Sequence, residues 1–450
     1  MNPNLDLCSS YFDGLENLIE LHLCENKLKK FDSKYLKDFK NLKILNLTCN
    51  QINLSLSSFV YLTSIEELYL NNNNLVKLES SFFKDLVKLK KLSLRNNQID
   101  INSCQFQYCE ELEYLDIAEN DLNVIEAHVF QNFQQLKILD LAWNKINLDS
   151  SLFSDLDNLE ELFLQNNSIH SINSEPFRDL KGLKKLNLGS NAIAYFNPKL
   201  FQNLIDLEEL YLGYNNVVKI DAEAFNGLES LKILNIERNE LTEIAQHTFE
   251  SLVNLEELSL NFNDLSKIES YTFQNLNKLK RLNLQNNRLN SIHSNSFTSL
   301  ENLEELNLWC NHSIETLDKN LFRTLNKLKV LNLHTNSINH LDSSLFKSLK
   351  NLEELYLCSN LINKIELDTF QILVNLKKLD LSRNALEFVD SYMLSNLINL
   401  EYLNLSRNRI SIVDSKAFAN QVKIKHIDLC KFFLNQIIKF KFNLLIFINF

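Results

Sequence analysis

Residues 254–276 read NLEELSLNFNDLSKIESYTFQNL and contain the motif L-x-x-L-x-L-x-x-N-x-L, which begins at Leu255. The same motif, with small changes among aliphatic residues, returns every 23 to 25 residues along nearly all of the 450-residue chain. A fixed period of this length indicates a repeat architecture in which one structural unit is stacked many times. The eighteen motifs begin at Leu18, Leu42, Ile65, Leu89, Leu112, Leu136, Leu159, Leu183, Leu207, Leu231, Leu255, Leu279, Leu303, Leu328, Leu352, Leu376, Leu400 and Ile424.

Each motif contains one short stretch with the period of a β-strand. In Leu258-Ser259-Leu260 the two leucines point to one face of the strand and Ser259 points to the other. Because every unit supplies one such strand, stacking the units lays parallel strands side by side in one continuous sheet. A single unit cannot bury its leucines alone, so the pattern predicts a solenoid of about eighteen repeats.

Two further columns support the stacked arrangement. An asparagine at motif position 9 follows each strand, and its amide can bond the backbone of the turn and of the neighbouring coil. A large apolar residue lies six residues before each motif, and its ring can stack on that of the next coil to fill the interior. This second column consists of Phe12, Leu36, Phe59, Phe83, Phe106, Phe130, Phe153, Phe177, Phe201, Phe225, Phe249, Phe273, Phe297, Phe322, Phe346, Phe370, Leu394 and Phe418.

The unit at 254–276 resembles the typical 24-residue leucine-rich repeat of animal extracellular proteins, and the resemblance covers nearly the whole chain. The same class is found in Toll-like receptor ectodomains, Slit-type guidance proteins, chaoptin and the acid-labile subunit. It implies an α/β solenoid shaped as a horseshoe, with a parallel sheet on the concave face and irregular or short helical segments on the convex face. One departure from the family is that neither residues 1–17 nor residues 420–450 contain the cysteine cluster that caps such ectodomains.

The repeat pattern also predicts the domain organisation. Residues 1–11 form a short N-terminal segment without a cysteine cap, residues 12–430 form the solenoid, and residues 431–450 form an apolar tail outside the repeat. Phe432 replaces the motif asparagine, so the ladder is expected to stop near Leu429. Lys439 and Lys441 interrupt the tail, which falls short of a 20-residue membrane span. Membrane association is therefore expected only if a C-terminal anchor is missing or degraded.

Composition and motifs exclude several functions. A net charge of −11 disfavours a nucleic-acid partner, because affinity for phosphate backbones comes from clustered positive charge. The sequence has no phosphate-binding glycine loop, nucleophile elbow or metal-spaced histidine pair, so we expect neither catalysis nor a cofactor. Cys310, His334 and Cys358 come from successive coils, yet coils about 5 Å apart do not suit zinc, so their proximity is attributed to chance. A disulfide between Cys104 and Cys109 is left open.

Motif position 2 alternates in sign from coil to coil. Equivalent positions on adjacent strands are about 5 Å apart, so the column is expected to form cross-strand ion pairs. A solvated, electrically neutral ladder is the interpretation that this pattern favours. Its members are Lys43, Glu66, Lys90, Glu113, Lys137, Glu160, Lys184, Glu208, Lys232, Glu256, Lys280, Glu304, Lys329, Glu353, Lys377, Glu401 and Lys425.

Candidate binding residues lie at the solvent-facing motif positions 5, 7 and 8. Large aromatic side chains there have no core role, and clustered exposed aromatics are typical of protein interfaces. The predicted partner-binding residues are Trp143, Phe163, Tyr211, Tyr214 and Phe262, with Tyr69, Trp309 and Tyr356 further out. A predicted anion site, suited to a sulfated glycan or an acidic protein loop, consists of Arg383, Arg407, Arg409 and Lys431. A solvated surface remains the alternative for both sets.

Two functions from different classes remain open. The resemblance implies a non-catalytic recognition, adhesion or receptor-like module at the cell surface or outside the cell, with a protein ligand on its concave face. The absence of a signal peptide in residues 1–25 favours instead an intracellular adaptor or scaffold, located in the cytoplasm. Glycosylation sequons at Asn46, Asn53, Asn166, Asn311 and Asn404 suit the first alternative.

Overall fold

The structure is a computed structural model that describes residues 11–56, 58–103, 106–148, 151–172 and 175–431. The chain divides into two compact units, an N-terminal unit of residues 1–216 and a C-terminal unit of residues 217–450. Both are built from the repeating coils that the motif predicts. The predicted boundaries of the solenoid, at 12 and 430, stay a prediction.

The N-terminal unit carries a parallel sheet with one strand per motif. Its described strands pair in the order of the coils, and the leucine at motif position 4 faces its equivalent on the next strand, as in Leu115↔Leu139 and Leu186↔Leu210. The sheet strands are β1 (Glu20–His22), β2 (Ile44–Asn46), β3 (Glu67–Tyr69), β4 (Lys91–Ser93), β5 (Tyr114–Asp116), β6 (Ile138–Asp140), β7 (Glu161–Phe163), β9 (Lys185–Asn187) and β11 (Glu209–Tyr211).

The C-terminal unit repeats the same arrangement in the same register, for example Leu258↔Leu282 and Leu379↔Leu403. Because equal motif positions face each other along both sheets, each position forms a column that runs across the strands of its unit. The sheet strands are β12 (Ile233–Asn235), β13 (Glu257–Ser259), β15 (Arg281–Asn283), β17 (Glu305–Asn307), β18 (Val330–Asn332), β19 (Glu354–Tyr356), β20 (Lys378–Asp380), β22 (Tyr402–Asn404) and β24 (His426–Asp428).

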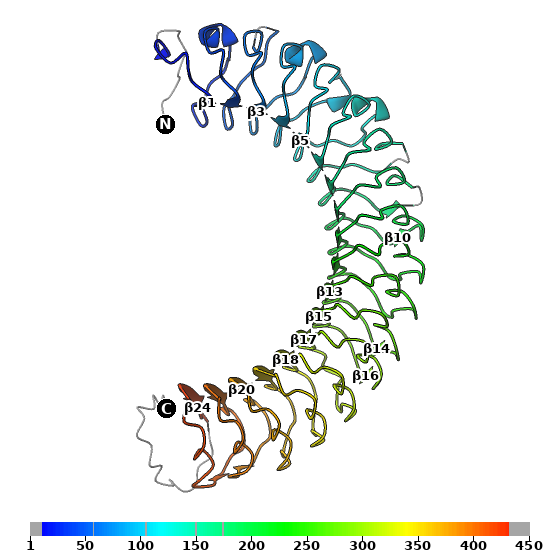
Figure 1. Cartoon of the computed structure of the whole chain (residues 1–450), viewed down its shortest axis with the longest axis vertical. Coiled ribbons are helices and arrows are strands. Elements are labelled where there is room, and N and C mark those ends of the chain that lie inside the picture. The colour runs from blue at the N-terminus through cyan, green and yellow to red at the C-terminus, as the bar shows by residue number, and fades with distance from the viewer. Residues whose placement is uncertain (1–10, 57, 104–105, 149–150, 173–174, 432–450) are drawn as a thin grey trace. The chain divides into compact units, whose positions relative to one another are not determined.

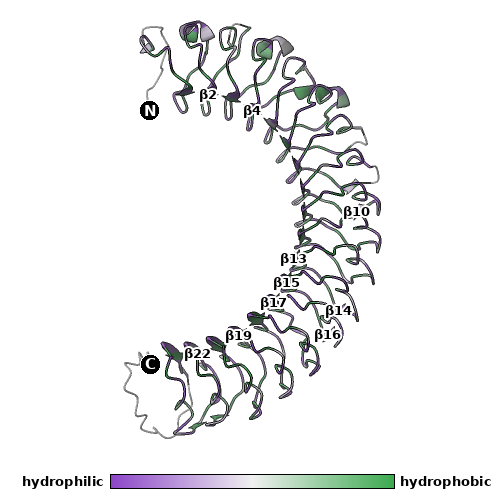
Figure 2. Cartoon of the chain, in the orientation of Figure 1, coloured by the Kyte–Doolittle hydropathy of each residue, from purple (hydrophilic) through white to green (hydrophobic). Residues whose placement is uncertain are grey.

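Short helices and two-residue strands lie on the side of each coil opposite the sheet. In both units the sheet strands line the inner side of the curve and these segments lie outside it (Figure 1), as the family resemblance implies. Hydrophobic and hydrophilic stretches alternate within the coils (Figure 2). The outer elements are the 3-10 helices η2 (Ser33–Leu36), η3 (Ser80–Phe83), η4 (Ile101–Ser103) and η5 (Ala127–Val129), and the strands β8 (Ser171–Ile172), β10 (Tyr195–Phe196), β14 (Lys267–Ile268), β16 (Ser291–Ile292), β21 (Phe388–Val389) and β23 (Ile412–Val413).

The interior is the predicted aromatic column. Phe249 and Phe273 have ring centroids 6.2 Å apart and planes 9° apart, and Phe297 and Phe322 lie 6.5 Å apart at 6°. Leu36, which replaces phenylalanine in one coil, is fully buried as well. This confirms that one large apolar side chain per coil fills the space behind the sheet.

The asparagines at motif position 9 form the predicted ladder. The Asn263 Nδ2 donates to the carbonyl oxygens of Leu260 in its own coil and Ile236 in the preceding coil, both at 3.0 Å. Its Oδ1 accepts from the Leu241 N–H at 3.1 Å. Backbone groups that face the interior are thus paired, which removes the penalty of burying them unbonded.

One feature of the repeating coils was not predicted from the sequence. In all eighteen motifs the residue at position 8 adopts a left-handed conformation, with φ between 50° and 61°, and none of these residues is glycine. The N–H of this residue donates to the carbonyl of position 7 in the next coil, as from Trp143 to Gln165 at 2.9 Å. Position 8 is therefore held rigidly in a conformation that bulky residues rarely adopt.

The described part of the sheet ends with β24, and residues 432–450 of the predicted apolar tail lie outside the described residues. Among the residues that the structure describes, no helix has the length and apolarity to cross a membrane.

Candidate functional site

The charged column at motif position 2 forms ion pairs across the strands, as predicted. Lys184 Nζ lies 2.7 Å from Glu160 Oε2, and Lys280 Nζ lies 2.8 Å from Glu256 Oε2. The lysine side chains of these pairs are about half exposed, so each pair contributes little to stability. The column alternates nine lysines with eight glutamates, so it presents no concentrated charge to a ligand.

Two of the predicted aromatic residues are less accessible than expected. Phe163 on β7 and Tyr211 on β11 flank Lys185 on β9, whose ammonium lies 6.0 Å and 5.5 Å from the two ring centroids. Lys185 also pairs with Glu209 at 2.8 Å, and the Tyr211 hydroxyl donates to Glu209 at 2.9 Å. Both rings are half-buried, because neighbouring strands bring a cation between them, and their role in partner binding stays a prediction.

Trp143 and Tyr214 are the accessible aromatic residues of the predicted set in the N-terminal unit, with 55% and 51% of their surface exposed. Both occupy position 8 and have a left-handed backbone. Their rings therefore project from a rigid turn at the end of a strand. Of the predicted partner-binding residues, these two have the exposure that an interface residue needs.

Trp143 lines an open depression of about 520 Å³ in the N-terminal unit. The other lining residues are Asn96, Asn97, Gln98, Glu119 and Asp121, which belong to the two preceding coils. The depression is thus polar and acidic on one side and aromatic on the other. Lys145 approaches its rim, since Lys145 Nζ lies 3.0 Å from Asp121 Oδ1.

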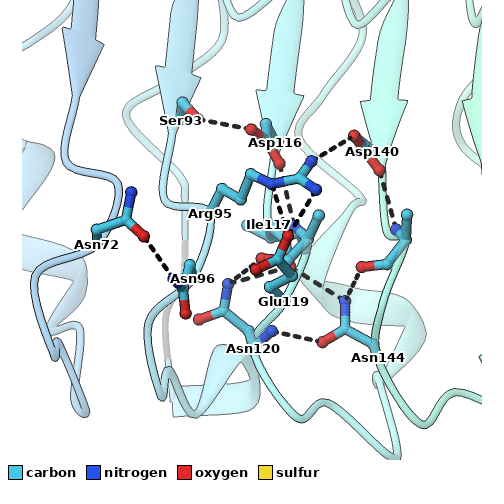
Figure 3. A network of polar contacts seen from close by, with 12 residues as sticks. Asn72, Ser93, Arg95, Asn96, Asp116, Ile117, Glu119, Asn120, Asp140 and Asn144 are labelled. Atoms are coloured by element: carbon cyan, nitrogen blue, oxygen red, sulfur yellow. Dashed lines mark hydrogen bonds and ion pairs between the residues drawn. The ribbon is translucent and has the colours of Figure 1, made fainter. Parts of the chain in front are cut away.

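Beside this depression lies a network of charged groups that sequence reasoning missed (Figure 3). Asp116 on β5 and Asp140 on β6 face each other in register at position 5. Arg95 donates to Glu119 Oε1 at 2.6 Å and to Asp140 Oδ2 at 3.5 Å. Ser93 Oγ donates to Asp116 Oδ2 at 2.7 Å. The network carries more carboxylates than cations, so this part of the sheet has a negative surface.

Burial perturbs both aspartates of this network. It raises the pKa of Asp116 and of Asp140, although the N–H groups of Ala118 and Ala142 and the charge of Arg95 act in the opposite direction. The available sequence signal was Asp at position 5 followed by Ala at position 7 in two successive motifs, Asp116-Ile117-Ala118 and Asp140-Leu141-Ala142.

In the C-terminal unit, Phe262 at position 8 is covered by a neighbouring cation. The Arg238 guanidinium carbon lies 4.0 Å from the Phe262 ring centroid, and the ring is half-buried. The ring is less exposed than the rings of Trp143 and Tyr214, because the preceding coil supplies an arginine at the same position, and its role in partner binding stays a prediction. This contact forms a cation–π pair instead.

The predicted basic residues of the C-terminal unit are exposed. Arg383, Arg407 and Lys431 occupy position 8, and Arg409 lies two residues beyond it. Within the described residues no carboxylate lies within 4.0 Å of any of these four side chains. An acidic residue at position 5 interacts with one of these basic residues. The charge of Arg407 helps to lower the pKa of Asp428.

The cysteine and histidine residues of the C-terminal unit form pairs. His334 Nδ1 contacts Cys358 Sγ, whereas Cys310 Sγ lies 3.2 Å from His312 Nε2. Burial raises the pKa of the Cys358 thiol to about 12 and lowers the pKa of His334, so both groups favour their neutral forms. In the described part of the chain no group of three or more His, Cys, Asp or Glu side chains is arranged to hold a metal ion.

Two other sequence features have a structural context. Asn311, one of the five sequons, is fully buried and donates to the Leu308 carbonyl at 3.0 Å as a member of the asparagine ladder. A glycan at Asn311 is incompatible with the folded chain, whereas Asn53 is exposed. Cys109 is a buried free thiol, and its candidate disulfide partner Cys104 lies outside the described residues.

Parallel strands in register, an asparagine ladder and a stacked aromatic interior define the class of proteins built from β-solenoid coils with one strand per repeat. The chain belongs to the leucine-rich-repeat proteins. The family model for the BspA-type leucine-rich-repeat region matches residues 76–208 and 194–329. The leucine-rich-repeat model matches residues 2–52, 16–75, 301–362, 334–386 and 374–431. A comparison with curated proteins finds no match.

Solved structures share the fold. Toll of Drosophila, in its complex with Spatzle, is 22% identical with a TM-score of 0.78 over 91% of this chain and 53% of the Toll chain. This chain therefore spans about half the length of that relative. A leucine-rich-repeat protein of Leptospira interrogans is 24% identical, with a TM-score of 0.67 over 96% of this chain and 95% of the other. TLR13, in its complex with ssRNA13, is 25% identical, with a TM-score of 0.65 over 93% of this chain and 72% of the other.

Proposed function

We propose that this chain is a non-catalytic binding module of an extracellular or cell-surface recognition, adhesion or receptor-like protein. Its ligand is a protein, which it binds on the concave face of the N-terminal unit. The observation that carries this proposal is the exposure of Trp143 and Tyr214 on rigid left-handed turns. A large aromatic side chain has few rotatable bonds, so it loses little conformational entropy on binding and gains much from burial.

The relatives support a macromolecular ligand and differ in its kind. Toll is solved with Spatzle, whereas TLR13 is solved with a single-stranded RNA. For this chain the net charge of −11 and the acidic network beside Trp143 favour a protein over RNA, because RNA binding depends on positive charge. An intracellular adaptor remains the alternative, and it would use the same surface.

The proposal is tested with a partner found by screening the folded chain against a library of secreted and cell-surface proteins. Trp143→Ala and Tyr214→Ala are each expected to lower the affinity at least tenfold, about 1.4 kcal/mol, while the melting temperature changes little. Phe225→Ala, in the interior column, serves as the contrasting variant that lowers stability. If both surface variants bind as the unsubstituted chain does, the aromatic site is wrong.

The exposed basic residues favour a second candidate, a sulfated glycan on the C-terminal unit. Arg383, Arg407, Arg409 and Lys431 have no carboxylate within ion-pair distance among the described residues. Heparin is the probe, and Arg383→Ala with Arg407→Ala is expected to weaken its binding and to reduce the salt dependence. Loss of ligand binding in this double variant alone, with Trp143→Ala unaffected, would move the functional site to the C-terminal unit.

A further inference from the structure

The depression next to Trp143 combines an exposed aromatic face with carboxylates. Glu119 and Asp121 line it together with Trp143 and with the side chains of Asn96 and Gln98. Asp121 is well exposed, with 77% of its side chain accessible, and its ion-pair partner Lys145 is 61% accessible. Such a pair is weak in water, so an incoming cation can replace Lys145 at Asp121 with little loss.

The charge around the depression is unbalanced. Asp116, Glu119, Asp121 and Asp140 supply four carboxylates, whereas Arg95 and Lys145 supply two cations. Burial of Asp116 and Asp140 makes their charges costly, which a further cation nearby would relieve. The electrostatic field at the depression therefore favours a positively charged group.

The turn that carries Trp143 does not require a tryptophan. At φ 56° the favoured residues are glycine and asparagine, and asparagine does occupy the same position at Asn72, Asn96 and Asn166. Tryptophan at this position costs stability and gains no core contact, since the side chain is mostly exposed. All eighteen motifs share this backbone conformation, so the side chain at position 8 is free to vary, and at Trp143 it places an exposed aromatic face beside the depression.

We propose that this depression binds a cationic side chain, arginine or lysine, of the protein ligand. The cation lies over the Trp143 indole and pairs with Asp121, and Glu119 of the same coil as Asp121, itself paired with Arg95, adds a second carboxylate to the lining. Cation–π contacts are strongest with tryptophan, and an adjacent carboxylate adds a charge-assisted hydrogen bond. This assignment rests on the proposed function and specifies which chemistry of the ligand the N-terminal unit recognises.

The two tryptophans of the chain make a direct test practical. The full chain is labelled with 5-fluorotryptophan, so its ¹⁹F spectrum contains Trp143 in the N-terminal unit and Trp309 in the C-terminal unit as an internal control. A blocked peptide of alternating glycine and arginine is titrated at low salt, followed by the lysine and glutamate versions of the same peptide. The Trp143 signal is expected to shift saturably with the two cationic peptides, while Trp309 stays unchanged.

Two matched variants locate the charge. Asp121→Asn keeps the shape of the rim and is expected to raise the apparent Kd about threefold, whereas Lys145→Ala removes the competing cation and is expected to lower it. The inference is overturned if the Trp143 signal does not move, if the glutamate peptide moves it equally, or if both variants titrate as the unsubstituted chain does.

The test also separates this inference from the proposed function. A protein ligand that needs Trp143 and Tyr214 but binds equally well to Asp121→Asn and Lys145→Ala would leave the proposed function standing and overturn the cation site. If the cationic peptides bind as expected but the protein ligand binds Trp143→Ala as tightly as the unsubstituted chain, the cation site stands and the proposed function is overturned.

Discussion

The N-terminal and C-terminal units are built from the same repeating coil but carry surface patches of opposite charge. In the coils that begin at Leu112 and Leu136, position 5 holds Asp116 and Asp140 and the carboxylates outnumber the cations. In the coils that begin at Leu376 and Leu400, position 8 holds Arg383 and Arg407, which project into solvent without an ion pair among the described residues.

The frame beneath these surfaces is the same in both places. Leucines at position 4 pair in register, as Leu115↔Leu139 and Leu379↔Leu403, and the position 8 residues are left-handed throughout. Folding therefore constrains the apolar, asparagine and phenylalanine positions and leaves positions 5, 7 and 8 free to vary. Function is to be sought in the columns where the two units differ.

The largest effect tests whether the frame is equal in the two units. Phe153→Ala and Phe297→Ala each remove a fully buried ring that stacks on both neighbours, at 6.1 Å from Phe177 and 6.0 Å from Phe273. Each variant is expected to lose about 3–5 kcal/mol in denaturant-induced unfolding, because a cavity remains that the stacked coils cannot close. A loss confined to one variant would show that the interior columns of the two units do not contribute equally to stability.

The asparagine ladder gives the next largest effect. Asn144 donates to the Ile117 and Leu141 carbonyls, and Asn384 makes the equivalent bonds to Leu357 and Leu381. Either residue changed to alanine leaves buried backbone groups unpaired, and we expect a loss of about 2 kcal/mol or more at each site.

The matched control for the ladder is Asn123→Ala. Asn123 is exposed, and within the described part of the chain its side chain only accepts from the N–H of its neighbour Val124, at 2.8 Å. The control is expected to change stability by less than about 0.5 kcal/mol. Equal losses for Asn144→Ala and Asn123→Ala, measured by the same unfolding titration, would refute a special role for the ladder.

The fold was predictable from the sequence because its determinants repeat. Leucines, asparagines and phenylalanines at fixed motif positions predicted the strands, the ladder and the interior column, and the alternating charges predicted the ion pairs. The left-handed turn was missed because residues as different as Glu119, Trp143 and Arg383 occupy position 8 and no glycine marks it. A positive φ is usually predicted from a glycine in the sequence, and this repeat has no glycine at position 8.

The candidate site was predictable only in part. The motif positions assigned Phe163, Tyr211 and Phe262 to the solvent-facing side of the sheet. They could not show that Lys185 and Arg238 contact these rings. Those contacts depend on which residues of neighbouring coils share a register, and on how long side chains reach across strands. The same limit concealed Arg95, which reaches from one strand to carboxylates of the next two coils.

A smaller effect tests how much the left-handed backbone at position 8 lowers the free energy of unfolding in each unit. Trp143→Asn and Arg383→Asn introduce a residue that adopts φ near 55° readily, so each is expected to raise stability by up to about 1 kcal/mol. The reverse change, Asn166→Ala at the same motif position, is expected to lower it by a similar amount. Thermal unfolding measures all three, and a loss of stability in Trp143→Asn would mean that the indole supports the fold.

The smallest effect concerns pH and gives opposite signs in the two units. Burial raises the pKa of Asp140, whereas at Asp428 burial is outweighed by hydrogen bonds from Cys430 and Ser406 and by the charge of Arg407, which lower the pKa. Asparagine keeps the turn in both cases, since Asn404 at the same position accepts from the Ser406 N–H at 3.0 Å. The substitutions Asp140→Asn and Asp428→Asn therefore isolate the charge.

The signs follow from proton linkage. Above its raised pKa, ionised Asp140 destabilises the fold, so Asp140→Asn is expected to be more stable than the unsubstituted chain at pH 7, and the gain should disappear as the pH falls towards the ordinary value of 3.8. Ionised Asp428 stabilises the fold, so Asp428→Asn should be less stable at pH 7, and this loss should persist down to 3.8 and shrink only below it. Melting temperatures at pH 7, 5 and 3 distinguish the two curves. Variants that change stability with the same sign would show that the carboxylates at position 5 have one environment throughout the chain, and the contrast between the two units would then rest on position 8 alone.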